Sequence, residues 1–192
     1  MSEERPWFDA DRKQQSLDLD DRAEKFYKEF WNVQQLRSLE SGQLEYSRDD
    51  DEKSTIELFD CAGVDLLLYA DKRYITVAQR WRPNSGRYNV DFSVRLENGS
   101  TESAEFIKHL ESYRQHGLLP SVYSFGIHNG DTFDEFYLID ARAVLRAYDE
   151  GNLEVKSHGK KYDGTMAGYI KIEDLEEQGC ILQAWPEGWV AE

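Results

Sequence analysis

An acidic residue stands directly before a short apolar run, and a basic segment ends the next apolar run. Asp65 closes the segment Asp60-Cys-Ala-Gly-Val-Asp65, and the second run ends in Gln79-Arg80-Trp81-Arg82. Carboxylate oxygens are the ligands that Mg²⁺ and Mn²⁺ prefer, and arginine guanidinium groups bind phosphate oxygens. If the two runs form neighbouring strands, these side chains could hold a divalent cation against a phosphate.

The two apolar runs have the features of a β-hairpin. Residues 64–69 follow Gly63 and are nearly all apolar, which predicts a short buried strand. Residues 70–73 predict the turn, and residues 74–82, ended by Pro83, predict the second strand. Because successive strand residues face opposite sides, Gln79 and Arg80 are expected on opposite faces.

The rest of the chain predicts helices around further strands. Helices are expected at 17–31, 103–116 and 141–148 and strands at 88–96, 122–127 and 133–139, with 33–46 open between strand and short helix. Residues 1–16 are expected to be a flexible arm, 17–150 the core, and 151–192 a C-terminal extension packed on that core in a single domain. This order predicts an α/β (α+β) fold with a mixed central sheet flanked by helices.

Charge is distributed unevenly along the 192 residues. With 23 basic and 38 acidic residues the net charge is -15, which argues against coating nucleic acid by bulk attraction. Adaptation to high salt (a halophilic protein), DNA mimicry and a simple acidic face are all consistent with it. Residues 72–95 hold six basic residues and one acidic residue, a charge of +5, so the remainder carries -20. Such a basic stripe is expected where one face meets phosphates, although arginines paired with acidic neighbours explain it equally well.

Most other chemistries lack their motifs. The chain has no phosphate loop, dinucleotide-binding glycine pattern, HExxH or GxSxG segment. Cys61 and Cys180 lie far apart without a CxxC pair, which predicts two buried free thiols and no zinc site. No apolar run could span a bilayer and no signal peptide is visible, so a cytoplasmic location is expected. The histidines are expected at the surface or an interface: His109, His116, His128 and His158.

A helix carrying Glu24, the Asp60 to Asp65 segment, and the strand Val77-Ala-Gln-Arg-Trp-Arg82 together resemble the PD-(D/E)XK, or restriction-endonuclease-like, superfamily. The resemblance covers residues 17–140, including the strand at 91–95 and the helix at 104–108. It is greatest to uncharacterised phage- and plasmid-type members, mobile-element proteins whose second strand usually ends in glutamine, any residue, lysine, an aromatic residue and arginine.

The resemblance implies roles for particular residues. Asp65 would be the central ligand of a Mg²⁺ or Mn²⁺ ion, Glu24 an auxiliary metal ligand, and Gln79 and Arg80 members of the catalytic motif. The metal would lower the pKa of a bound water and stabilise the reacting phosphate of DNA. Further roles would be nucleic-acid binding by Arg73, Arg80, Arg82, Arg87 and Arg95, and support of the site by Asp60, Glu105 and Lys108.

The second strand departs from the family pattern. With Ile75 and Val77 in the core, the family's acidic or glutamine position falls on Ala78 and its lysine on Arg80. A one-residue bulge would put Gln79 in the ligand position, but Trp81 would then replace the lysine. Arginine stays protonated and serves mainly as a phosphate clamp.

Three functional classes therefore stay open. They are a metal-dependent DNA endonuclease, a non-catalytic nucleic-acid-binding module of the same fold, and a protein-interaction or structural component. The oligomeric state is equally open and includes a homodimer.

Overall fold

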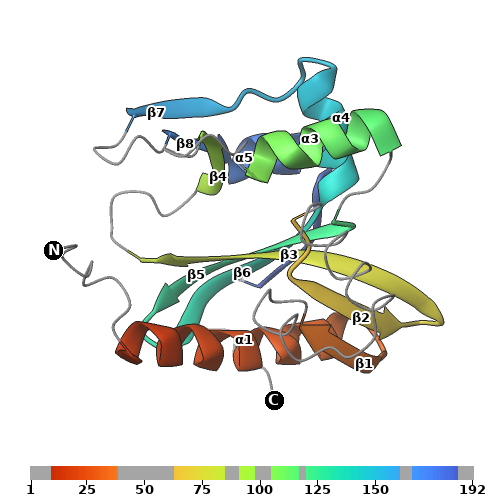
Figure 1. Cartoon of the computed structure of the whole chain (residues 1–192), viewed down its shortest axis with the longest axis vertical. Helices are drawn as coiled ribbons and strands as arrows, with labels where there is room; N and C mark the ends of the chain where they lie inside the picture. The colour runs from red at the N-terminus through yellow and green to blue at the C-terminus, as the bar shows by residue number, and fades with distance from the viewer. Residues whose placement is uncertain are drawn as a thin grey trace, which may run out of the picture.

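A six-stranded sheet lies between one long helix on its lower face and a layer of shorter helices above it (Figure 1). The computed structural model describes residues 10–38, 63–84, 91–97, 105–116, 120–160 and 166–185. The described helices are α1 (Ala10–Phe30), α3 (Glu105–His116), α4 (Ala141–Asp149) and α5 (Ile172–Glu177). The described strands are β1 (Val33–Ser38), β2 (Leu66–Ala70), β3 (Arg73–Pro83), β4 (Asp91–Glu97), β5 (Val122–Asn129), β6 (Thr132–Asp140), β7 (Lys156–Lys160), β8 (Met166–Lys171) and β9 (Ile181–Trp185).

The large sheet is mixed, as the sequence predicts. Its strand order is β1-β2-β3-β5-β6-β9, and only the central pair β3 and β5 is parallel. The connection between these two strands contains α3, which lies above the sheet (Figure 1). The fold is therefore a mixed α/β arrangement with helices on both faces of a mixed central sheet.

Both faces of the central sheet are buried, each in its own hydrophobic cluster. The cluster toward α1 includes Phe26, Val77 and Phe136, and the Phe26 and Phe136 rings stack with centroids 4.2 Å apart. The cluster on the opposite face includes Ala78 and Phe125. Since Val77 and Ala78 are adjacent and both fully buried, β3 lies in the middle of the core and not at its edge.

Three expectations about the elements need correction. Helix α1 begins at Ala10, so residues 10–16 belong to a helix and not to the flexible arm expected at 1–16. The sequence predicted one central sheet, but β4 pairs with β8 in a second, three-stranded sheet. The C-terminal extension does more than pack on the core, because β9 pairs with β6 and completes the central sheet.

None of the described helices has the length and apolar content that a membrane crossing requires.

A tight turn sets the register of the β2–β3 hairpin. Asp71 and Lys72 have φ of 50° and 62°, the left-handed pair of a two-residue hairpin turn whose twist matches that of the strands. The strands then pair from Ala70 with Arg73 to Leu66 with Val77. This register brings the residues just before β2 beside the second half of β3.

Candidate functional site

The carboxylate of Asp65 joins the two segments that the sequence singled out. The Asp65 backbone N–H donates to the carbonyl of Val77 at 2.9 Å. The backbone N–H of Gln79 in turn donates to Asp65 Oδ2 at 2.6 Å. The start of β2 therefore lies beside Gln79 of β3, as expected from the hairpin that the sequence predicts.

The Gln79 and Trp81 side chains point toward α1. Gln79 Nε2 donates to the Tyr27 hydroxyl at 3.0 Å, and Trp81 Nε1 donates to Asp20 Oδ1 at 2.7 Å. The Tyr27 hydroxyl then donates to Ser124 Oγ on β5 at 2.8 Å, inside the core. The polar end of the hairpin is thus held against α1 by side-chain hydrogen bonds.

Tyr27 remains a neutral donor in this network. Burial raises the pKa of its hydroxyl far above the usual range, while the hydrogen bonds with Ser124 and Gln79 act in the opposite direction. The negative charges of Asp20 and Asp65 raise the pKa further, which places both carboxylates in the electrostatic neighbourhood of Tyr27. The Tyr27 hydroxyl therefore orients the Gln79 side chain by a hydrogen bond, and it stays neutral and does not act as a general base near neutral pH.

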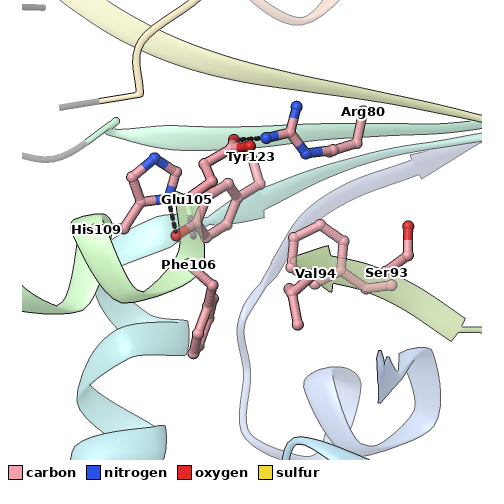
Figure 2. Close-up of a pocket in the computed structure, with 8 residues that line it drawn as sticks. Arg80, Ser93, Val94, Glu105, Phe106, His109 and Tyr123 are labelled. Carbon is pink, nitrogen blue, oxygen red and sulfur yellow. Dashed lines mark hydrogen bonds and ion pairs between the residues drawn. The ribbon is translucent and has the colours of Figure 1, made fainter. Parts of the chain in front are cut away.

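Arg80 lies on the opposite face of β3, against α3. Its guanidinium forms an ion pair with Glu105, the first residue of α3 (Figure 2). The close-up also shows His109 on α3 turned toward Tyr123 of β5, whose hydroxyl lies 2.9 Å from His109 Nδ1. These side chains surround a cavity of about 10 Å³, room for at most about one water molecule, so the pocket is too small for a substrate.

His109 is a neutral, buried imidazole. Burial lowers the pKa of His109 to about 3, and the positive charge of Arg80 lowers it as well. Within the described part of the chain, Nε2 has no hydrogen-bond partner of acceptable geometry, although the Gly63 backbone is close enough to favour the protonated ring. The expectation that all four histidines lie at the surface or an interface is wrong for His109, which is 1% exposed, and for the buried His128.

The structure separates several of the predicted site residues. Arg73 and Arg82 lie at opposite ends of β3, nine residues or about 30 Å apart, so the basic stripe is no single patch. Glu24 lies on α1, where its carboxylate pairs with Lys28 at 2.5 Å. Lys108 lies on α3, where its charge contributes to the low pKa of His109. Asp60 and Arg87 lie outside the described residues, as does the Arg95 side chain on β4.

Both faces of β3 are buried at its centre. Alternation along the strand holds, since Val77 and Ala78 belong to different clusters. However, Ala78 has no exposed surface, so its position is part of the core and not of an open site. Gln79, whose side chain reaches the α1 face, donates its backbone N–H to the Asp65 carboxylate.

Sequence reasoning missed the polar residues that hold this site. Tyr27 follows the helical spacing of the apolar residues of α1, but its hydroxyl contact with Gln79 depends on how α1 crosses the sheet. Asp20 lies seven residues before Tyr27, two helical turns along nearly the same face, which was the available signal. Cys180 is buried with a free thiol, as predicted, while Cys61 lies outside the described residues.

Comparison with known proteins gives no match: no protein-family model, no curated protein and no solved structure is significantly similar to the chain. The functional argument therefore depends on the residues and their geometry.

Replacing Asp65 by alanine is expected to lower the free energy of unfolding by about 1 to 3 kcal/mol, because a charged acceptor of the Gln79 N–H is lost. Asp65→Asn retains an acceptor oxygen and should cost less. Urea unfolding of both variants measures the effect. Asp131→Ala, which removes an exposed ion pair with Arg22, is the control and should change stability by less than about 1 kcal/mol. An Asp65→Ala value no larger than that of the control would show that the contact with β3 is unimportant.

Proposed function

We propose that this protein is a nuclease-like DNA-interacting protein with a restriction-endonuclease-like core. We propose further that it binds DNA at the open end of the β2–β3 hairpin, around Asp65 and Gln79, without cutting it. The observation that carries the proposal is the combination found on β3. Gln79 meets the Asp65 carboxylate through its backbone, while Arg80 and Trp81, the two residues that could replace the family's lysine, are engaged elsewhere.

The arrangement around the hairpin supports the fold assignment. Helix α1 precedes the hairpin in the chain and packs on its sheet, and the second hairpin strand continues as the parallel neighbour of β5. Asp65 stands at the start of the first hairpin strand, the position that the resemblance gives to the central metal ligand.

Neither residue at the lysine position can move a proton near neutral pH. Arg80 stays protonated, and its ion pair with Glu105 holds it on the α3 face. The Trp81 indole N–H is only a donor, and it is already bound to Asp20. A nucleophilic water would therefore lack the group that orients and deprotonates it.

The nearby carboxylates do not form a prebuilt metal site. Within residues 10–38, 63–84 and the other described ranges, no group of three His, Cys, Asp or Glu side chains is placed to share a metal ion. Asp65, Asp20 and Glu24 each accept a hydrogen bond or ion pair from a protein group. A Mg²⁺ or Mn²⁺ ion, which in this superfamily would activate water at a phosphate, would therefore need water or the substrate phosphate to supply most of its ligands here.

The test combines a cleavage assay with a binding assay on the whole protein. Labelled duplex, nicked and branched DNA are incubated with Mg²⁺ and with Mn²⁺, and binding is followed by fluorescence anisotropy at low and high salt. We expect no metal-dependent cleavage, and salt-sensitive binding that weakens in the Arg82→Ala variant, because Arg82 lies at this end of β3. Arg114→Ala, which removes an exposed arginine paired with Asp149, is the matched control and should bind normally.

Two outcomes would overturn the proposal in different ways. Metal-dependent cutting by the parent protein that disappears in Asp65→Ala would make the protein an active endonuclease. Absence of DNA binding even at low salt, where phosphate contacts are strongest, would leave the protein-interaction class instead.

A further inference from the structure

A groove opens near the turn of the β2–β3 hairpin, at the end of the sheet away from Asp65. It has a volume of about 450 Å³, within the range of small-ligand pockets. Its lining comes from α1, the amino-terminal ends of β3 and β5, the start of α4 and the start of β9. Six lining residues matter for its chemistry: Phe30, Trp31, Arg73, Tyr74, Arg142 and Leu182.

Exposed apolar surface gathers in this groove. Tyr74 is 68% exposed and Leu182 is 41% exposed, and with Leu17 they are the large hydrophobic side chains exposed in the described part of the chain. The Tyr74 ring is supported from one side by Tyr69, with centroids 5.1 Å apart. Tyr74 therefore presents an aromatic surface that nothing described in the fold covers.

The groove is also positively charged, which is unusual in a chain of net charge -15. Arg73 and Arg142 both line it and are exposed, and neither forms an ion pair with any residue that the structure describes. Asp140, the acidic residue of the lining, already accepts hydrogen bonds from the backbone N–H groups of Arg142 and Ala143 at 2.9 and 3.0 Å as the cap of α4. Two arginines against one carboxylate leave a lining that favours an anion.

We propose that this groove binds a nucleotide unit, with its base against Tyr74 and its phosphate held by Arg73 and Arg142. Stacking on an aromatic ring and charge-assisted hydrogen bonds from arginine are the two interactions that a base and a phosphate require. The same chemistry is offered by a free mononucleotide and by the end of a nucleic-acid strand.

An acidic peptide fits this groove less well. The residues Arg73 and Tyr74 belong to β3, which pairs with β2 on one side and β5 on the other. Beside Arg73 and Tyr74 a peptide therefore has no free strand edge to extend, and would lose the main-chain hydrogen bonds that give such complexes their affinity.

The inference goes beyond the proposed DNA contact at the hairpin end. Arg73 lies six residues before Gln79 on the same strand, about 20 Å away, and the groove uses neither Asp65 nor Gln79. Binding of a mononucleotide or a short single strand can therefore succeed or fail independently of duplex binding at the hairpin.

The experiment measures binding of a fluorescent, 5′-phosphorylated oligothymidylate to the whole protein by anisotropy, with adenosine 5′-monophosphate as competitor. Tyr74→Ala and Arg142→Gln should each weaken binding by about tenfold. The matched controls are Leu17→Ala, another exposed hydrophobic residue, and Arg146→Gln, an exposed arginine one turn further along α4, and both should bind like the parent protein. Because Tyr74 and Arg142 are exposed, their variants should also keep the parent melting temperature.

Each outcome decides the proposal. Competition by the mononucleotide supports a site for free nucleotides, and binding of the oligonucleotide without such competition supports a strand-end site. Equal binding by parent and groove variants would overturn the proposal, as would binding of a glutamate- and phenylalanine-rich peptide with no binding of either nucleotide probe. An Asp65→Ala variant that still binds the oligonucleotide separates this groove from the hairpin site.

Discussion

Gly63→Ala is expected to lower the free energy of unfolding by about 2 to 5 kcal/mol, the sum of backbone strain and steric overlap. Gly63 has φ of 66°, in the left-handed region that alanine adopts only at a cost. An added Cβ would also lie 2.1 Å from His109 Nε2, far inside contact distance. The imidazole cannot move aside cheaply, because it is buried and its Nδ1 is hydrogen-bonded to the Tyr123 hydroxyl.

Gly130→Ala separates the two contributions. Gly130 has nearly the same φ, 65°, but no atom lies within 4 Å of a Cβ built there. Its substitution should therefore cost only the backbone strain, about 1 to 2 kcal/mol. Equal losses at the two glycines in urea unfolding would show that His109 exerts no steric constraint on the segment before β2.

A double variant tests the same contact directly. In a His109→Ala background the added Cβ has no imidazole to meet, so the cost of Gly63→Ala should fall to that of Gly130→Ala. The difference is the interaction energy between positions 63 and 109. A large interaction energy would show that His109 on α3 constrains the backbone at Gly63, two residues before Asp65. The α3 face of the hairpin would then be coupled to the segment that carries Asp65.

The hairpin could be predicted because its signals are local. The apolar run of β2, the short turn and the alternating residues of β3 lie within about twenty residues, and a two-residue turn leaves little freedom in register. The contact between Asp65 and Gln79 follows from that register. For strand β4 the signals are only partly local. Its alternating residues predict a strand, but its partner β8 lies far along the chain. Which sheet a strand joins is decided by such distant pairing.

The polar network around Gln79 could not be derived in the same way. Tyr27, Gln79 and Ser124 come from a helix and two strands, and their hydroxyl and amide groups meet only after α1 crosses the sheet. His109 was more accessible to prediction, since it lies three residues after Phe106 on the apolar face of its helix. Its burial follows from that spacing, whereas its orientation toward Tyr123 depends on how α3 sits over β5.

The stability of the parent protein is expected to fall more steeply below pH 6.5 than that of His109→Gln. In the unfolded chain the imidazole has its ordinary pKa of 6.5, whereas burial lowers the pKa of folded His109 to about 3. Between these values the unfolded state binds one proton that the folded state excludes, so stability is full above pH 6.5 and is lost as the pH falls toward 3. The loss is about 1.4 kcal/mol for each pH unit, or roughly 2 kcal/mol between pH 6.5 and about pH 5.

Urea unfolding of the two proteins at a series of pH values from neutral to about pH 5 measures this difference. Glutamine cannot take up a proton, so the His109→Gln variant retains the contributions of all other titrating groups and removes only that of His109. The variant is expected to be less stable at neutral pH, because its packing against Tyr123 changes, but its pH profile should be flatter. Parallel profiles would mean that His109 is protonated in the folded state, with Nε2 and the Gly63 backbone in hydrogen-bonding geometry. In that case the positive charges of Arg80 and an imidazolium would share the cavity beside Glu105, and the ion pair that holds Arg80 away from the hairpin site would be weakened.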